Sequence, residues 1–165
     1  MYISQIDTRR PETVATKDVE KTEKSEQLEK IKVKIRFDYR GTPRPARFFF
    51  GGKGTKEVAE ERREQQATMW RNVPLQGIQV EDIIYLDLYT VYESLDETEI
   101  TYAPIELLIS LDSLEDCLQF ISRPEFRRLQ VLEPARVSLT SRELERILYK
   151  FSETLQQKLH EQEEL

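Results

Sequence analysis

Ten consecutive residues, written IKVKIRFDYR, constrain the fold of this chain more than any other segment. From Ile31 to Arg40, apolar and polar side chains alternate without interruption. Successive side chains of an extended strand point to opposite sides, so strict alternation predicts a strand with one buried side. Gly41, Pro43 and Pro45 end it, because proline cannot donate to a strand ladder. We therefore expect a sheet that is covered on one face only.

Patterns elsewhere predict three more strands and three helices. β-branched and aromatic runs indicate the strands, and apolar residues at helical spacing indicate the helices. Thr55 is the expected N-cap of the first helix, and Thr140-Ser141-Arg142-Glu143 resembles a capping box ahead of the last. The expected strands are 31–40, 83–93, 100–111 and 126–133, and the expected helices are 56–70, a short one between Ser113 and Pro124, and a long one after Thr140.

The order strand, helix, strand, strand, helix, strand predicts the α+β class. It is the ferredoxin-like βαββαβ pattern, an antiparallel sheet with helices on one face, here with an additional C-terminal helix. The alternative is another α+β sandwich in which Arg47–Phe50 adds a strand. Composition predicts a flexible charged tail at 1–28, a single α+β domain at 29–160 that includes the C-terminal helix, and a frayed acidic end at 161–165.

Charge is distributed unevenly along the chain. The whole chain has a formal net charge of -6. Residues 30–56 contain nine Lys and Arg against one acid, Asp38, which gives +8 there and leaves -14 for everything else. Such a chain is not a general polyanion binder, although this segment predicts a local basic face.

A single histidine, His160, and a single cysteine, Cys117, limit the available chemistry. Zinc sites and catalytic triads need sets of ligands or partners that these two residues cannot supply in the usual form. We expect no enzymatic activity, no cofactor and no metal, with Cys117 as a buried structural thiol. One cysteine favours a reducing cytoplasm. No secretory signal is expected at the N-terminus, and no apolar run approaches the ~20 residues of a membrane helix.

The segment Arg47–Glu57, written RFFFGGKGTKE, resembles a phosphate-binding loop at first sight. Its spacing fits neither a Walker loop nor a dinucleotide fingerprint. Glycines ahead of a helix can still let backbone N–H groups converge on an anion. The favoured interpretation is a loop whose glycines only relieve backbone strain, and a phosphate or nucleotide site at 51–55 is the weakest of three functional hypotheses.

The polar side of the strand at 31–40 predicts a nucleic-acid site as the alternative function. Basic and aromatic groups on the open face of a sheet suit the phosphates and bases of RNA or single-stranded DNA. Lysines on an exposed strand are also ordinary solvation, which is the favoured interpretation. Arg128 and Gln130 are expected on the same face, with Tyr85 and Tyr89 beside them. The proposed anion or nucleic-acid contacts are Lys32, Lys34, Arg36, Arg44, Arg47, Lys53 and Lys56.

The final helix carries its apolar residues along one side, from Leu144 to Leu159. One half of this stripe can pack on its own domain, while the part beyond Ser152 is expected to overhang. An overhanging stripe usually binds a partner helix, often in a second copy. The alternative is that the whole stripe covers the core of its own domain. The expected partner or oligomer contacts are Leu148, Phe151, Leu155 and Leu159.

Four pieces between Ile105 and Phe151 stand in an order that a known family shares. They are the strand IELLISL, the helix LEDCLQFI, a strand closing in Val131-Leu132-Glu133-Pro134, and a helix ending near Tyr149 and Phe151. In these pieces the chain resembles the C-terminal extension of WYL-domain transcription regulators. The resemblance implies a ferredoxin-like fold with regulatory or oligomer contacts, and sometimes nucleic-acid contact. The chain lacks a winged-helix segment and a WYL core, so the resemblance bears on fold more than on function.

These patterns favour a small, cytoplasmic, non-enzymatic module that binds a macromolecule. The leading hypothesis is a regulatory or adaptor protein that acts through protein–protein contacts, as a homo-oligomer through Tyr149–Leu159. The nucleic-acid module built on segment 30–56 is the alternative, and neither version involves a membrane or a metal.

Overall fold

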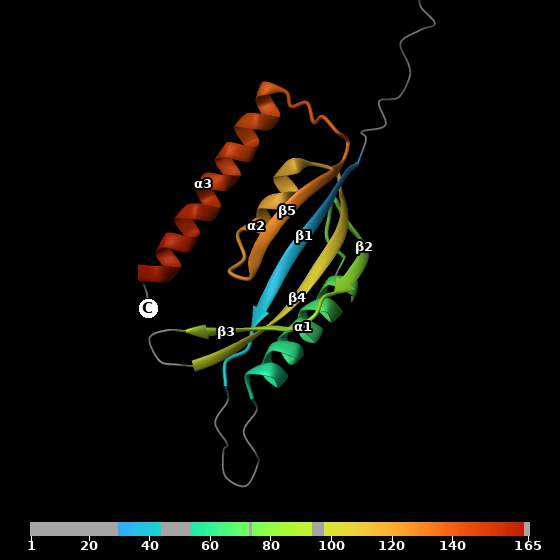
Figure 1. Cartoon of the computed structure of the whole chain (residues 1–165). Coiled ribbons are helices and arrows are strands. Elements are labelled where there is room, and N and C mark those ends of the chain that lie inside the picture. Colours follow the sequence, from blue (N-terminus) through green and yellow to red (C-terminus); the bar gives the residue numbers. More distant parts are fainter. Residues whose placement is uncertain (1–29, 44–53, 73, 94–97, 164–165) are drawn as a thin grey trace, which may run out of the picture.

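Antiparallel strands form one sheet, and helices cover one of its faces (Figure 1). The computed structural model describes residues 30–43, 54–72, 74–93 and 98–163, so the predicted tail at 1–28 and the possible strand at Arg47–Phe50 lie outside it. The described strands are β1 (Ile31–Arg40), β2 (Ile78–Tyr85), β3 (Tyr89–Glu93), β4 (Thr98–Leu111) and β5 (Phe126–Glu133). The helices are α1 (Thr55–Asn72), the 3-10 helix η1 (Leu114–Cys117), α2 (Leu118–Ile121) and α3 (Ser141–Glu163).

The strand order is β2-β4-β1-β5, with β3 also paired to β4. Each of these pairings is antiparallel, and the α+β class predicted from the sequence is confirmed. The alternating strand β1 is central: Ile35 lies opposite Leu107 of β4 and Leu129 of β5. β4 is long enough to pair with β1 on one side and with β2 and then β3 on the other.

The alternation in β1 separates the two faces of the sheet as predicted. Val33, Ile35 and Phe37 are fully buried on the helix side. Phe37 stacks on Trp70 of α1, with ring centroids 6.1 Å apart, and Phe120 of α2 lies 6.4 Å away. Offset aromatic contacts of this kind add to the stability that area burial provides. The core therefore lies between the sheet and helices α1 and α2.

One predicted strand, 83–93, is two strands in the structure. Tyr85 pairs with Ile105 and Tyr89 pairs with Tyr102, so four steps along this segment match three steps along β4. The additional residue turns Tyr89 to the opposite face from Tyr85, because side chains in a strand alternate. At the break, the Arg63 guanidinium of α1 donates to the Leu86 carbonyl at 2.9 Å. The sequence pattern did not reveal this offset.

The junction between β1 and α1 depends on a glycine. A Cβ atom placed on Gly41 would lie 1.7 Å from the Thr55 carbonyl oxygen, so only glycine allows this close approach. The prediction that Thr55 is the N-cap is wrong, because α1 already includes Thr55. Instead, the Gly54 N–H donates to the Glu57 carboxylate at 2.6 Å. The Thr55 hydroxyl lies 3.1 Å from that of Thr101.

Helix α3 begins at the predicted capping box. The Thr140 hydroxyl accepts from the Glu143 N–H at 3.2 Å, and the Thr140 N–H donates to the Glu143 carboxylate at 2.7 Å. The helix continues to Glu163, into the end that was expected to fray. It packs beside η1 and α2 (Figure 1) and is joined to η1 by an ion pair of 2.6 Å between Arg146 and Glu115.

Candidate functional site

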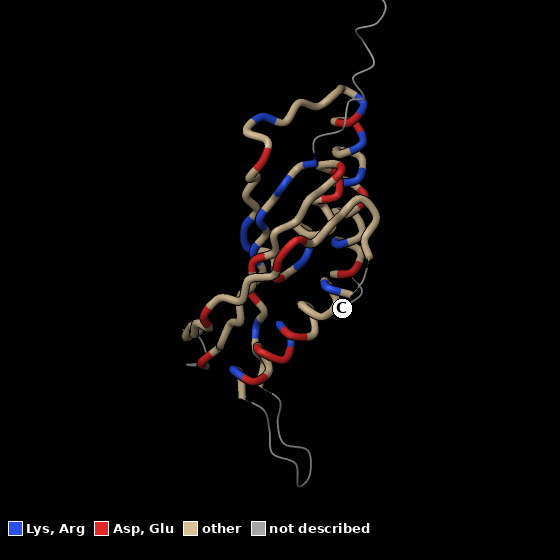
Figure 2. The backbone as a smooth tube through the Cα atoms, turned by 90° about the vertical axis from the view of Figure 1, so that its right-hand side faces the viewer, with Lys and Arg blue, Asp and Glu red and all other residues tan. Residues whose placement is uncertain are grey.

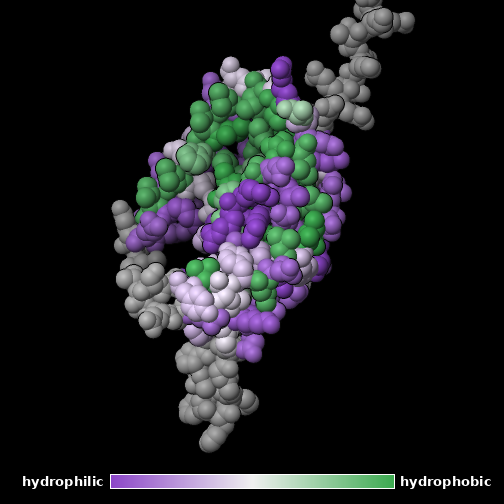
Figure 3. Space-filling model, viewed as in Figure 1, coloured by the Kyte–Doolittle hydropathy of each residue, from purple (hydrophilic) through white to green (hydrophobic). Residues whose placement is uncertain are grey.

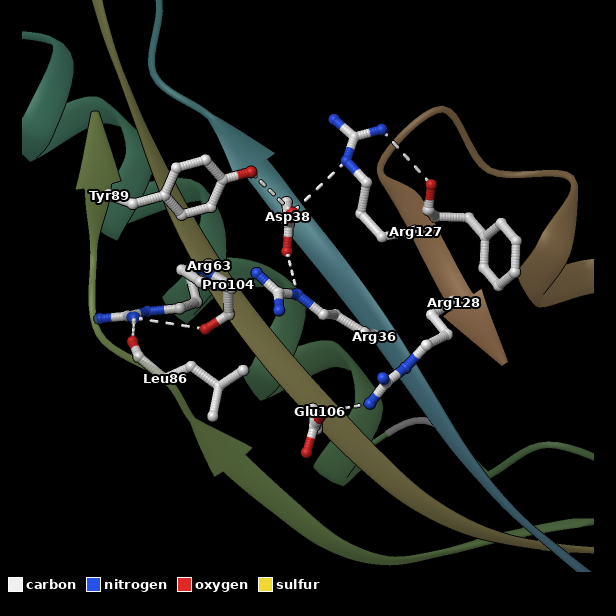
Figure 4. A network of polar contacts seen from close by, with 10 residues as sticks. Arg36, Asp38, Arg63, Leu86, Tyr89, Pro104, Glu106, Arg127 and Arg128 are labelled. Carbon is white, nitrogen blue, oxygen red and sulfur yellow. Dashed lines mark hydrogen bonds and ion pairs between the residues drawn. The ribbon is translucent and has the colours of Figure 1, made fainter. Parts of the chain in front are cut away.

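The sheet face opposite the helices carries a network of polar side chains, which we call the open face (Figure 4). β1 contributes every second residue to it, and the residues paired with these on the neighbouring strands point to the same side. Its polar members are Lys32, Lys34, Arg36 and Asp38 of β1, Glu81 of β2, Tyr89 of β3, Tyr102, Glu106 and Ser110 of β4, and Arg127, Arg128 and Glu133 of β5.

Asp38 is the centre of this network, although its side chain is only 4% exposed. Its carboxylate accepts from Arg36 Nε at 2.8 Å and from the Tyr89 hydroxyl at 2.7 Å, and Arg127 Nε lies 3.4 Å away. Burial, followed by the hydrogen bond to Asp38, raises the pKa of Tyr89. The hydrogen bond to Asp38 raises the pKa of Arg36. Sequence reasoning missed Asp38; its signal is a lone acid on the polar side of an otherwise basic strand.

Glu106 and Glu133 pair with three further cations of the open face. Lys34 Nζ and Arg128 Nη2 each lie 3.6 Å from Glu106, and Lys32 Nζ lies 3.1 Å from Glu133. On this face Ser110 donates to Glu81. Among the side chains named here, five cations against four carboxylates leave a formal charge of +1, and Arg40 and Asp82, which the register places on the same face, add one charge of each sign. Figure 2 shows basic and acidic residues interleaved along the chain, so the open face is far less basic than segment 30–56 suggested.

Only part of the predicted basic set comes together. Lys32, Lys34 and Arg36 share the open face, and Gln130 and Arg128 of β5 lie opposite Lys34 and Arg36 as predicted. Lys56 is exposed in the first turn of α1, beside Gly41 at the far end of β1. At 3.3 Å per strand residue it lies roughly 30 Å from Lys32. Three predicted contacts lie outside the described residues: Arg44, Arg47 and Lys53.

The aromatic part of the open face differs from the prediction. Tyr89 stacks on Tyr102, with ring centroids 5.2 Å apart and an interplanar angle of 12°. Arg127 lies over the Tyr102 ring at 5.8 Å. Tyr85 is on the helix side instead, where its hydroxyl donates to Glu64 of α1 at 3.1 Å. The register offset between β2 and β3 accounts for this division.

The apolar side of α3 is the second candidate surface. We call it the α3 stripe and define it as Leu144, Leu148, Phe151, Leu155 and Leu159. Each of these side chains is about half exposed; Leu148 is 59% and Phe151 is 51% exposed. Val131, Leu132 and Leu139, which precede α3 in the chain, are exposed apolar side chains as well, and so is Val91 of β3. Figure 3 shows hydrophobic side chains gathered over α3 and the adjoining end of β5.

The α3 stripe stays exposed because the helix packs by a different side. Its half-buried positions among the described side chains are Glu143 of the cap and, seven residues apart, Ile147 and Thr154, and Arg146 reaches Glu115. The described contacts of α3 with helices are to η1 and α2. The sequence suggested that the half of the stripe before Ser152 can pack on the domain, whereas Leu144 and Leu148 in that half are as exposed as the residues beyond it.

The remaining sequence candidates offer little chemistry in the described part of the chain. Burial raises the pKa of the Cys117 thiol to about 11, so the reactive thiolate is scarce near neutral pH. His160 is exposed on α3. In residues 30–43, 54–72, 74–93 and 98–163, no three His, Cys, Asp or Glu residues are grouped to hold a metal ion. None of the helices in these ranges is long and apolar enough to cross a membrane.

The glycine loop is described only from Gly54 onwards. There the Gly54 N–H, one of the groups that would receive an anion, donates to the carboxylate of Glu57. A carboxylate of the same helix therefore competes with any phosphate for the N-terminus of α1. Gly51, Gly52 and Lys53 lie outside the described residues.

Comparison with known proteins suggests no function for this chain. No model of a known protein family matches the chain, and a search of curated proteins found no match. The α3 stripe and the open face are therefore the surfaces from which a function can be argued.

Proposed function

We propose that this chain is a non-enzymatic regulatory or adaptor module that binds protein through the α3 stripe. The exposure of five apolar side chains in one line carries the proposal. Burying apolar area is worth roughly 25 cal/mol per Å², so covering the stripe would stabilise a complex. Contiguous apolar surface of this kind marks interaction sites more often than scattered apolar residues do.

The spacing of the α3 stripe favours a helical partner. Leu144, Leu148, Phe151 and Leu155 are separated by four, three and four residues. This is the alternation of core positions in a coiled coil, in which each side chain inserts between residues of a facing helix. An amphipathic helix is therefore the class of partner that fits the stripe best.

A comparative pull-down from the native cell lysate tests this proposal. The bait variants are wild type, Phe151→Glu plus Leu155→Glu, and the matched control Gln156→Glu plus Gln157→Glu. The control adds the same two charges to exposed positions of α3 outside the stripe. We expect bound proteins, including untagged copies of this chain, to be retained by wild type and control and lost from the stripe variant. Equal capture by all three baits would overturn the proposal.

A nucleic-acid-binding module is the second candidate, and the stack of Arg127, Tyr102 and Tyr89 favours it. Such a stack beside lysines can hold single-stranded bases. The pairing of each basic side chain with a carboxylate weighs against it. Its test is retention on single-stranded DNA or RNA that falls steeply with salt and is lost in Lys32→Glu plus Lys34→Glu. Absence of retention at low salt would exclude it.

A phosphate or nucleotide site at residues 51–55 is the third and weakest candidate. It predicts a thermal shift with phosphate or nucleotide that Lys53→Ala abolishes. The hydrogen bond from Gly54 to Glu57 makes us expect no such shift. A shift in wild type that Lys53→Ala removes would reverse this ranking.

We also propose that the sheet corresponds to the ferredoxin-like βαββαβ pattern, with its second strand divided into β2 and β3. The order β2-β4-β1-β5 supports this, since it places the first and third strands of that pattern in the centre. The resemblance of Ile105–Phe151 to the extension of WYL-domain regulators bears on this fold more than on function, and the regulatory role stays a prediction. A cytoplasmic location also stays a prediction and is supported by the single cysteine.

A further inference from the structure

We infer that the helix that covers the α3 stripe is α3 of a second copy of this chain, running antiparallel to the first. This inference rests on the proposed function, because it names the occupant of that same surface. It is argued from the symmetry of the stripe, the charge of the two halves of α3, and the polar positions that flank the stripe.

The α3 stripe is symmetric about a point between Tyr149 and Lys150. The steps between its first four residues are four, three and four, which read the same in both directions. In an antiparallel pair centred on this point, Leu148 faces Phe151 of the second copy and Leu144 faces its Leu155. The two-fold axis repeats both contacts. Such self-complementarity is what an isologous two-fold interface requires.

The same alignment also covers apolar side chains beyond these four layers. Leu159 comes level with Thr140 of the second copy, next to Leu139, which is an exposed apolar residue just before α3. Val131 and Leu132, at the end of β5, are exposed on the part of the molecule from which α3 starts. A second copy would therefore cover Leu139 at one end of the stripe and Leu159 at the other, as well as its centre.

Charge favours the antiparallel direction over the parallel one. Residues 141–150 carry Arg142, Arg146 and Lys150 against Glu143 and Glu145, a net charge of +1. In the alignment above, this half faces residues 149–158 of the second copy; beyond Lys150, that stretch carries Lys158 against Glu153, a net charge of zero. Antiparallel pairing therefore avoids placing the two positive halves against each other, and it also opposes the helix dipoles favourably. Parallel pairing would place like halves together.

The interface can close without burying an unpaired charge. Within the span from Leu144 to Leu155, the charged residue that flanks the stripe is Glu145, and the alignment brings it near Ser152 of the second copy rather than near another acid. Arg146 is already paired with Glu115 of its own domain. Lys158 stands where the heptad spacing would next require an apolar residue, and it pairs with Glu161 at 2.9 Å. The repeat therefore ends within about three turns of helix.

A contact of this length predicts a modest affinity. Helix Leu144–Leu155 is about 18 Å long, and a standard interface buries about 800 Å² on each partner. The α3 stripe with its neighbours offers less than that, so we expect a dissociation constant on the order of micromolar. The pair would form at high concentration and separate on dilution.

Two measurements on the purified chain test this inference. The first is molar mass by analytical ultracentrifugation over a concentration series. Wild type should approach twice the chain mass of 19.6 kDa at high concentration and return to 19.6 kDa on dilution. Phe151→Glu plus Leu155→Glu should stay monomeric, while Gln156→Glu plus Gln157→Glu should behave as wild type. If wild type is a monomer at every concentration, the inference that a second copy covers the stripe is wrong. The proposed function is then decided by the pull-down.

The second measurement sets the direction of the pair. Leu144→Cys and Leu155→Cys are made separately and oxidised with diamide, each alone and mixed. Antiparallel helices predict an intermolecular disulfide in the mixture and little in either variant alone, because Leu144 faces Leu155. Disulfides in each variant alone indicate parallel helices and overturn the inferred direction. Wild type is the control, since its Cys117 is buried and its thiol pKa is raised to about 11.

Discussion

The open face and the α3 stripe differ in whether their side chains find partners within the same chain. Five basic residues on the open face meet carboxylates of the same chain, with Asp38 and Glu106 each shared by two of them. On α3, the apolar residues from Leu144 to Leu159 stay half exposed. A polar network that is complete within one chain gains little from a ligand, whereas apolar surface left in water gains from any partner that covers it. The difference directs the search for function to α3.

The largest expected effect is on stability, and it compares a buried phenylalanine of the core with an exposed one of the α3 stripe. Phe37→Ala should lower the free energy of unfolding by about 3–5 kcal/mol, because it opens a cavity in the core. Phe151→Ala should change the stability of the monomer by no more than about 0.5 kcal/mol. Urea denaturation at low protein concentration measures both. A large loss for Phe151→Ala in the monomer would mean that the α3 stripe packs on its own domain.

The next effect tests whether the open face is a closed network. Asp38→Asn removes the charge that holds Arg36, Arg127 and the Tyr89 hydroxyl, and we expect a loss of about 2 kcal/mol. The matched change Glu106→Gln alters two longer ion pairs, both of 3.6 Å, around a carboxylate that is more exposed than Asp38, and it should cost about 0–1 kcal/mol. Chemical denaturation of both variants makes the comparison. Equal losses would show that Asp38 is no more central than Glu106.

A smaller effect concerns the attachment of α3. Thr140→Ala removes the hydroxyl that accepts from the Glu143 N–H, and a lost N-cap costs about 1 kcal/mol of helix stability. Because α3 packs on η1 and α2 rather than on the sheet, the loss should be local. Hydrogen exchange should rise in the first turns of α3 and stay unchanged in β1. Thr140→Ser keeps the hydroxyl and should behave as wild type, and faster exchange in β1 would show that α3 and the sheet unfold together.

The smallest effect is a pH dependence at the same cap. Hydrogen bonds from the Thr140 N–H and hydroxyl lower the pKa of Glu143 below its usual value of 4.5. A lowered folded-state pKa gives stability that is present above the usual value and is lost as the pH falls through the folded value. Helicity of α3, followed by circular dichroism, should therefore fall on acidification below about pH 4.5. Glu143→Gln should weaken this dependence, and identical titrations would contradict the capping box.

Local patterns predicted the parts of the fold that depend on neighbouring residues. Alternation located β1 and predicted that Val33 and Lys34 point to opposite faces of the sheet. The Thr140–Glu143 pattern located the start of α3. The break after Tyr85 was missed because it depends on register against β4, which lies far away in the sequence. The neutralisation of Lys34 was missed for the same reason, since Glu106 belongs to another strand. The candidate residues of α3 were predictable because helical spacing is local, but their exposure depends on how the helix packs.

The close approach at Gly41 has a consequence for protein engineering. Gly41 touches the first residue of α1 and accepts no larger side chain there, and its N–H donates to the Thr101 carbonyl at 2.9 Å. The two ends of the segment 42–54 are therefore held together by the folded domain. Closing a loop costs only about 0.6 kcal/mol more for each doubling of its length. A peptide tag or a small domain inserted between residues 44 and 53 should thus be carried by this chain with little loss of stability, at the opposite end of β1 from the start of α3.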